Sequence, residues 1–268
     1  MSDLAKNRSN RATDWVPPDA NRRLKSVDRI AALLNGFTDQ RPSMTLTEAA
    51  ELLGLHKSSA SRLLRQLADT GLLHRLDDGQ RYAVGVRLFE IGNLYTSSND
   101  FIRVSDPFLQ RLVQATGHTA QLCVPDDFES VVVASEESRE LIRAAANLGG
   151  RLPAMTTASG RVFLAHRTDE EIHDHWAETS PDRRPARDHL LAAIARIRQD
   201  GICVVVGGYR PEILSLAAPV YGPGRVLRGA LCLVMPNTEH ARASLDACRR
   251  ATTDLARELS ARLGHAPS

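Results

Sequence analysis

Two short helical segments joined by a tight turn, between residues 45 and 67, limit the possible folds of this chain more than any other feature. Thr45 followed by Glu48 has the spacing of a capping box, so a helix is expected to begin there and to stop at Gly54. A second helix is expected over residues 58–67. Its apolar residues recur at the three- and four-residue steps of a helix that faces a core: Ala60, Leu63, Leu64 and Leu67.

The flanking segments extend this pair into a larger unit. Ser26 is expected to cap an earlier amphipathic helix. After Gly71, two strand-like runs at 72–76 and 81–84 are joined by a segment that contains the hairpin signal Asp78-Gly79. Three helices with a tight second turn, followed by a hairpin, predict a winged helix-turn-helix over residues 24–84.

The third helix of this unit carries the most specific chemistry. No Asp or Glu occurs between residues 52 and 68, and the outward positions are basic or carry hydroxyls. Such a surface suits the major groove, because short hydroxyl side chains let the backbone approach phosphates and arginine can bond guanine. The candidate DNA-binding residues are Thr45, Lys57, Ser58, Ser59, Ser61, Arg62, Arg65, Arg75 and Arg81. A solvated charged face on a small helical domain is the plainer alternative.

Within this set the expected roles differ. We expect Lys57 and the pair Ser58-Ser59 to contact phosphates, and Arg62 and Arg65 to approach bases. The two arginines that flank the hairpin are expected to contact the adjacent backbone or the minor groove. A single winged helix touches few base pairs, so a two-fold dimer on a palindrome is the physical expectation.

The pattern changes after residue 84. Residues 85–117 are expected to form a helical linker, interrupted at 97–100, with Pro107 near a helix start. Beyond it, strand-like runs and helices predict an α+β domain over residues 118–268. The expected strands lie at 120–124, 130–134, 140–144, 201–206, 214–221 and 228–235, and the expected helices at 159–168, 169–177, 187–199 and 239–263. Residues 1–23 have almost no apolar period and are expected to form a flexible arm.

Composition narrows the environment and the partners. The chain has 34 Lys and Arg against 32 Asp and Glu, a net charge of +2, so any surface for nucleic acid has to be local. No apolar run approaches the ~20 residues of a membrane span, and the N-terminus has no signal peptide. The four cysteines lie far apart, which fits reduced thiols. We therefore expect a cytoplasmic protein with no membrane partner.

No catalytic or metal-binding arrangement is evident in the sequence. Ser159 lies in Ala-Ser-Gly rather than in the GxSxG elbow of a hydrolase. His173 and His175 diverge on a helix, so a solvated polar face is favoured over a metal site. We expect no metal, no cofactor and no enzymatic activity. Two alternatives stay open: a DNA-binding dimer that senses no ligand, and a cryptic catalytic module in the second domain.

The sequence resembles the IclR family of bacterial transcriptional regulators in five stretches that occur in the family's order. They are SVDR (26–29), LTEAA (46–50), KSSASRLL (57–64), RLP to TASGR (151–161) and LAAPV (216–220). The resemblance covers roughly residues 24–260. It implies a GAF-like effector-binding domain, a dimer or dimer of dimers (a homotetramer), and a repressor on a palindromic double-stranded DNA operator. The effector it implies is a small organic acid or an aromatic metabolite.

A loop in the second domain is the candidate for effector binding. Between Gly149 and Gly160 it carries hydroxyls that lead into a helix, which suits a carboxylate but equally suits ordinary caps. The resemblance places the effector at Leu141, Leu152, Ala158, Ser159, Val205, Ser215, Cys232 and Val234. Family members often carry acidic residues where this chain has 205–208, and polar residues at 232 and 234. We therefore expect an apolar or aromatic acid to bind better than pyruvate or glyoxylate.

Overall fold

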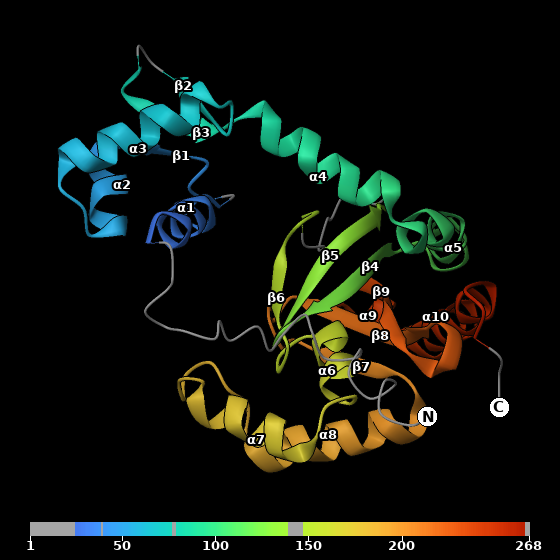
Figure 1. Ribbon diagram of the computed structural model, residues 1–268. Coiled ribbons are helices and arrows are strands. Elements are labelled where there is room, and N and C mark those ends of the chain that lie inside the picture. The colour runs from blue at the N-terminus through green and yellow to red at the C-terminus, as the bar shows by residue number, and fades with distance from the viewer. Residues whose placement is uncertain (1–24, 39, 77–78, 139–146, 266–268) are drawn as a thin grey trace, which may run out of the picture. The chain divides into compact units, whose positions relative to one another are not determined.

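The computed structural model describes residues 25–38, 40–76, 79–138 and 147–265. The chain divides into two compact units between Ser98 and Asn99 (Figure 1). The expected arm at 1–23 and the expected strand at 140–144 lie outside the described residues, and so does Leu141. Among the described residues, no helix combines the length and the apolarity that crossing a membrane requires.

The first unit is a helical domain with a small antiparallel sheet. Its elements are α1 (Lys25–Asn35), β1 (Ser43–Thr45), α2 (Leu46–Leu53), α3 (Lys57–Asp69), β2 (Leu73–Leu76), β3 (Arg81–Val84) and α4 (Val86–Ser98). The sheet has the order β1-β3-β2. Three helices and a β2–β3 hairpin make the predicted winged helix-turn-helix.

A single apolar core holds this unit together. Leu33 of α1, Met44 of β1 and Leu64 of α3 are fully buried in it, and Tyr82 of β3 closes it from the sheet. The apolar stripe predicted for α3 therefore faces the core, which leaves the opposite side of that helix to solvent.

The helix ends follow the local sequence signals with one correction. Thr45 and Glu48 form the predicted capping box at the start of α2, and Gly54 ends the helix in the left-handed conformation, with φ of 60°. Ser26 is not an N-cap, because α1 already begins at Lys25. The strand β1 was not predicted: its three residues pair with β3, about forty residues further along the chain.

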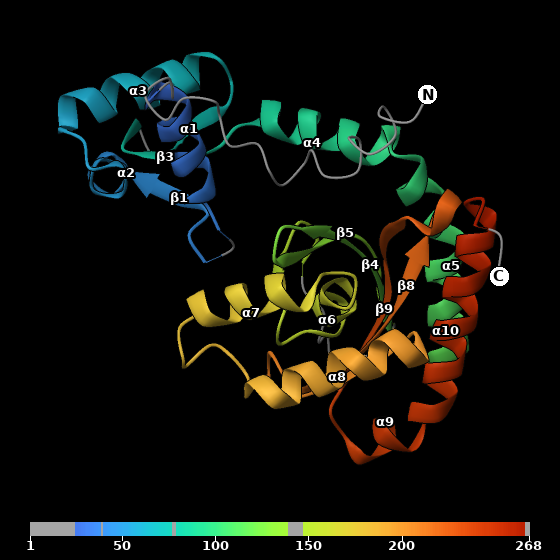
Figure 2. The same ribbon diagram turned by 60° about the horizontal axis from the view of Figure 1, so that its bottom comes forward.

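The second unit is a six-stranded antiparallel sheet covered on both faces. Its strands are β4 (Thr119–Asp126), β5 (Glu129–Glu136), β6 (Arg151–Pro153), β7 (Cys203–Val206), β8 (Ile213–Tyr221) and β9 (Leu227–Pro236), in the order β6-β5-β4-β9-β8-β7. Its helices are α5 (Asp100–Thr116), α6 (Ala158–Leu164), α7 (Asp169–Glu178), α8 (Arg187–Asp200), α9 (Glu239–Ala243) and α10 (Leu245–Arg262), with the short 3-10 turn η3 (Pro223–Arg225). In Figure 2, α5 and α10 lie side by side against one face, and α6 lies on the other with α8.

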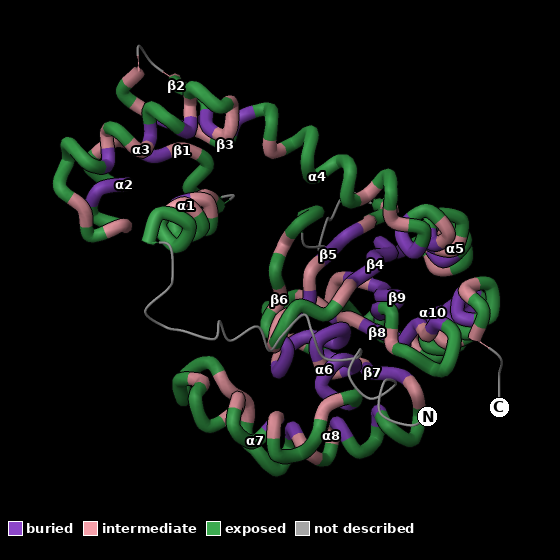
Figure 3. The backbone as a smooth tube through the Cα atoms, viewed as in Figure 1, coloured by how far each residue is buried: buried purple, intermediate pink, exposed green. Residues whose placement is uncertain are grey.

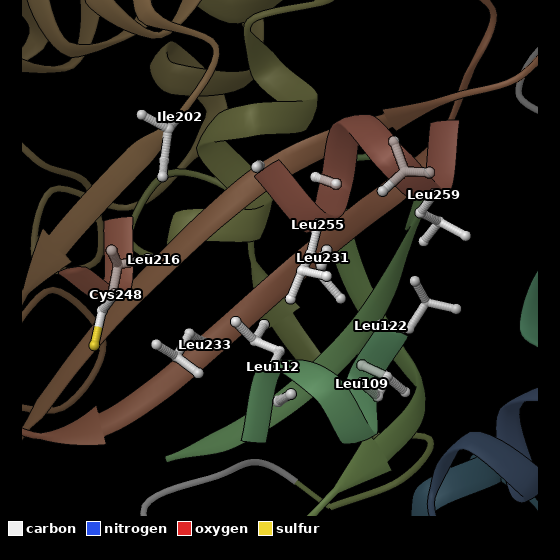
Figure 4. Packing of buried hydrophobic residues seen from close by; sticks show 14 of the residues in the cluster. Leu109, Leu112, Leu122, Ile202, Leu216, Leu231, Leu233, Cys248, Leu255 and Leu259 are labelled. Atoms are coloured by element: carbon white, nitrogen blue, oxygen red, sulfur yellow. The ribbon is translucent and has the colours of Figure 1, made fainter. Parts of the chain in front are cut away.

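Alternation along the central strands creates two separate cores. Leu122 of β4, Leu216 of β8 and Leu231 of β9 point toward α5 and α10, where they meet Leu109 and Leu255 (Figure 4). Neighbouring positions on the same strands face α6: Cys123, Ala217 and Cys232. Figure 3 shows the central strands buried along most of their length.

The expected linker at 85–117 differs in extent from the structure. α5 packs on the sheet and contributes Leu109 and Leu112 to its core, so only α4 remains as a connecting helix. Pro107 lies inside α5 rather than near a helix start. The expected helix at 239–263 is two helices, α9 and α10, which meet at Ser244. The strand β6 was not predicted.

Candidate DNA-binding surface and effector cavity

The outward face of α3 is basic and uncovered. Lys57, Ser58, Ser59, Arg62 and Arg65 are exposed, whereas Ala60, Leu64 and Leu67 are buried beneath them. Within the described part of the chain, no carboxylate forms an ion pair with α3's basic residues. Arg65 makes one long contact, 3.5 Å, with the hydroxyl of Ser61 on the same face. These side chains are available to a partner outside the protein.

Two residues predicted to contact DNA are held by the protein itself. The hydroxyl of Thr45 accepts the amide N–H of Glu48 at 3.2 Å, and the Thr45 amide donates to the Glu48 carboxylate at 2.6 Å. Arg81 donates from Nε to the hydroxyl of Ser43 at 2.9 Å and from Nη2 to its carbonyl at 3.1 Å. Arg81 thus joins β3 to β1, and Thr45 fixes the start of α2.

Arg75 lies on the wing. It is exposed on β2, with its guanidinium 5.8 Å from the centre of the Tyr82 ring. Unlike Arg81, it makes no hydrogen bond to another residue in the described part of the chain, so its donors are available to another molecule.

A cavity of about 70 Å³ opens into the second unit on the α6 side of the sheet. One water needs only ~10–15 Å³ of such space, so the cavity has room for a small organic molecule. Seven of the eight predicted effector residues line it: Leu152, Ala158, Ser159, Val205, Ser215, Cys232 and Val234. The eighth, Leu141, lies outside the described residues.

The sequence did not single out the other side of the cavity. Further lining residues come from β4, from the turn between β7 and β8, and from β8 itself: Gln121, Cys123, Gly208, Tyr209, Arg210, Ile213 and Leu216. Arg210 brings the one charged side chain among the described lining residues. A lone arginine in the turn after a valine-rich strand is the signal that could have identified it.

The hydroxyls of the 153–160 loop have different roles. Thr157 is an ordinary cap: its hydroxyl accepts the N–H of Gly160 and donates to the carbonyl of Pro153 at 2.8 Å. Thr156 Oγ1 is buried with no hydrogen-bond partner, although the residue lines the cavity. A buried hydroxyl without a partner is costly, so this atom is suited to bind a polar group of a ligand.

Backbone contacts hold this loop in place. A Cβ on Gly160 would lie 2.3 Å from the Cα of Ala154, and a Cβ on Gly208 would lie 2.4 Å from the carbonyl oxygen of Thr156. Only glycine fits at either position without movement of the backbone. The cavity wall is thus shaped by close packing between α6, its loop and the β7–β8 turn.

Two thiols form part of the cavity wall. Cys123 and Cys232 lie on the neighbouring strands β4 and β9, and both line the cavity. Hydrogen bonds from the Cys232 thiol and from the Ser130 and Ser159 hydroxyls lower the pKa of Cys123, against the opposing effect of burial. The same hydrogen bond and burial raise the pKa of Cys232.

The histidines of α7 do not form a metal site with their neighbours. His175 stacks on Phe128 with ring centres 4.0 Å apart, and His173 stacks on Trp176. No group of three or more potential metal-ligating side chains occurs among the residues that the structure describes.

Comparison with known proteins agrees with this architecture. The description "IclR helix-turn-helix domain" matches residues 26–77, and "Bacterial transcriptional regulator IclR C-terminal" matches residues 93–261. The acetate operon repressor of Salmonella typhimurium is 25% identical over 251 residues, which cover 89% of this chain and 85% of the relative.

Solved structures show the same fold. A transcriptional regulator from Rhodococcus sp. RHA1 is 26% identical, with a TM-score of 0.76 over 90% of this chain and 99% of the other. An IclR homologue from Microbacterium hydrocarbonoxydans, complexed with 4-hydroxybenzoate, is 23% identical, with a TM-score of 0.72 over 88% and 99%. The C-terminal family match alone spans more than half of the sequence. This chain therefore belongs to the IclR family, as a DNA-binding transcriptional regulator with an effector-binding C-terminal domain.

Proposed function

We propose that this regulator is a repressor that binds a palindromic operator through α3 and releases it when an aromatic or apolar carboxylic acid enters the cavity. The proposal that the protein binds DNA through α3 rests on the exposed basic face of that helix. The effector-binding part of the proposal rests on the cavity, whose mostly apolar wall contains one guanidinium and one buried hydroxyl without a hydrogen-bond partner. The protein acts in the cytoplasm.

On DNA, the exposed residues of α3 divide by position. Lys57, Ser58 and Ser59 begin the helix, where free backbone N–H groups and the positive end of the helix dipole favour a phosphate. Arg62 and Arg65 lie one and two turns further on and reach base edges in the major groove. Arg75 reaches the neighbouring backbone from the wing. Thr45 and Arg81 contribute by holding α2 and the wing in position.

In the cavity, the effector's carboxylate meets Arg210 and its ring lies against Leu152, Val205 and Val234. A second polar group on the ligand hydrogen bonds to Thr156 Oγ1. The complex of the Microbacterium homologue with 4-hydroxybenzoate supports a ligand of this class. Pyruvate and glyoxylate should bind less well, since these acids have little apolar surface to bury against Leu152, Val205 and Val234.

The repressor acts as a dimer, in which α4 is part of the interface. None of the residues of α4 is buried, although several of them are apolar. Val86, Phe89 and Leu94 are each more than 60% exposed. Apolar residues occur on several sides of this helix, which is typical of a helix covered by other protein. A second copy of the chain is the partner that a palindromic operator requires.

The test has two linked parts. Genomic fragments selected by the purified protein define the operator, and its affinity is then measured with 4-hydroxybenzoate, benzoate, pyruvate or glyoxylate present. An effector coupled by about 1–3 kcal/mol changes operator affinity roughly 5- to 150-fold. We expect the aromatic acids to weaken binding and to raise the melting temperature more than the two small acids do. Operator binding that no acid alters would favour a ligand-independent regulator.

A further inference from the structure

Two polar side chains of the cavity wall come from segments that touch each other. Thr156 lies in the loop before α6, and Arg210 lies in the turn between β7 and β8. A Cβ on Gly208 of this turn would lie 2.4 Å from the Thr156 carbonyl oxygen, so the turn rests directly on the loop. Arg210 is two residues further on, which keeps its backbone within about 7 Å of Gly208. The two side chains therefore start from the same side of the cavity.

Hydrogen bonds hold the β7–β8 turn in a compact form. The amide of Gly207 donates to the carbonyl of Ile213 at 2.8 Å, and the amide of Ile213 donates to the carbonyl of Arg210 at 3.0 Å. Asn237, which follows β9, donates from Nδ2 to the carbonyl of Pro211 at 2.9 Å. The backbone that carries Arg210 is thus fixed next to the loop before α6.

Thr156 differs from the other hydroxyl residues of the cavity wall. The hydroxyl of Thr157 donates to a backbone carbonyl, and the hydroxyl of Ser159 accepts a hydrogen bond from Ser130. Ser215 is partly exposed, so water can reach it. Thr156 Oγ1, in contrast, is shielded from solvent and has no hydrogen-bond partner. A ligand atom that reaches it supplies a hydrogen bond that the protein does not.

The wall changes in character away from the turn. Val205 of β7, Ser215 of β8 and Val234 of β9 lie in register across three neighbouring strands, and the turn follows Val205 at one end of this row. Strands lie ~4.8 Å apart, so the row extends ~10 Å from the turn side to Val234. An aromatic acid with its carboxylate at Arg210 directs position 4 of its ring along this row, away from Thr156. A substituent at position 2 stays beside the carboxylate.

We propose that the cavity selects aromatic acids that carry a hydroxyl next to the carboxylate. The carboxylate binds Arg210, and the adjacent phenolic oxygen accepts a hydrogen bond from Thr156 Oγ1. In 2-hydroxybenzoate these two groups are on neighbouring ring carbons, whereas in 4-hydroxybenzoate they are at opposite ends of the ring. Thr156 is then the residue that distinguishes the isomers. This inference rests on the proposed function, because it requires the acid to bind in this cavity.

Hydroxybenzoate isomers, which share one formula and one charge, provide the test. Isothermal titration calorimetry measures the affinity of the full-length protein for 2-, 3- and 4-hydroxybenzoate and for benzoate at neutral pH. We expect 2-hydroxybenzoate to bind roughly 3- to 10-fold more tightly than benzoate, which lacks the hydroxyl. It should also bind more tightly than the other two isomers. A preference for 4-hydroxybenzoate would overturn the inference.

Variants of Thr156 assign the preference to its hydroxyl. T156V has nearly the same shape without the hydroxyl, so 2-hydroxybenzoate should bind to it no more tightly than benzoate does. T156S should restore the preference. Each result is a ratio of two ligands in one protein, so a general effect of the substitution on the fold cancels. T253V, on α10 and outside the cavity lining, is the matched control and should keep the wild-type ratio. A preference that survives in T156V would reject the role of Thr156.

Failure of this inference differs from failure of the proposed function. If the aromatic acids bind and alter operator affinity, but 2-hydroxybenzoate has no advantage that depends on Thr156, only this inference is rejected. If none of the four acids binds, the cavity is not a site for aromatic acids, and the inference falls together with the proposed effector.

Discussion

Ser130 on β5 donates a hydrogen bond of 2.8 Å to the hydroxyl of Ser159 in the first turn of α6. Both residues are buried, at 0% and 4% exposure. This bond fixes the first turn of α6 to the sheet beside the cavity. The position of Ser159 in the cavity wall thus depends on a residue 29 positions earlier in the chain.

Removing either hydroxyl should destabilise the second unit. S159A removes the acceptor of the buried Ser130 hydroxyl, at an expected cost of about 1–3 kcal/mol in the free energy of unfolding. The double variant S130A/S159A leaves neither group unsatisfied, so its cost should be smaller than the sum of the two single costs. Urea denaturation of the four proteins measures this difference. Additive effects would mean that the bond contributes nothing.

The basic face of α3 leads to a second prediction. R62A and R65A should each weaken operator binding by about 1–3 kcal/mol if the arginines contact bases. K57A should weaken operator and unrelated DNA alike and reduce the salt dependence of binding. Fluorescence anisotropy at several salt concentrations measures both effects.

The matched control for these variants is R196A, since Arg196 is an exposed arginine on α8 of the second unit. It should leave both affinities unchanged. Equal losses in R62A and R196A would indicate a general charge effect rather than a DNA-binding surface.

Local signals predicted the first unit well, because they act between near neighbours. The capping box of Thr45 and Glu48, the stop at Gly54 and the apolar stripe of α3 are each set within a few residues. The strand β1 was missed since its three residues are held by β3 and Arg81, 38 residues away from Ser43. The same holds for β6, which is defined by its pairing with β5.

The sequence predicted less well which elements pack against one another and which residues the fold brings into the cavity. The apolar pattern of α5 indicates a helix but not that its partner is the sheet of the second unit. In the cavity, the family resemblance identified seven lining residues, from Leu152 to Val234, but not Gln121 and Cys123 of β4 or Ile213 and Leu216 of β8. Tyr209 and Arg210 were missed, because the turn between β7 and β8 has no periodic pattern and only the fold brings it to the cavity.

The capping box also predicts a pH dependence. Hydrogen bonds from the Thr45 amide and hydroxyl hold the pKa of Glu48 below its ordinary value of 4.5. A carboxylate whose pKa is lowered by folding stabilises the folded state above its unfolded pKa, and this stabilisation is lost as the pH falls through the folded pKa. E48Q removes the charge but keeps an acceptor for the Thr45 amide.

E48Q should therefore melt below the wild type at neutral pH, and the gap should close as the pH falls below 4.5. Melting followed by circular dichroism between pH 7 and about pH 3 measures it. E51Q, on the same helix but outside the capping box, should show a smaller gap. A gap for E48Q that stays constant with pH would contradict the assignment.

The exposed apolar residues of α4 predict the effect of a charge at the proposed dimer interface. Phe89 is 71% exposed, so F89E removes little packing within its own unit and should leave its fold intact. A buried charge at an interface is costly, so the variant should dissociate at concentrations at which the wild type is dimeric. Sedimentation equilibrium measures this, with E90Q, an exposed neighbour, as the control. A dimer of unchanged affinity in F89E would remove α4 from the interface.

The proposed contact between Arg210 and the effector's carboxylate can be tested by removing the charge of Arg210. The side chain is exposed at the cavity wall, so its ion pair with a bound acid is screened by water and should contribute only about 1 kcal/mol. R210Q should therefore lower the affinity for 4-hydroxybenzoate about fivefold. The matched ligand is 4-hydroxybenzamide, which keeps the ring and hydroxyl but carries no charge; its affinity should be the same in both proteins. Isothermal titration calorimetry with both ligands measures the four affinities. Equal losses for acid and amide would show that Arg210 shapes the cavity without recognising charge, and the carboxylate would then need another partner.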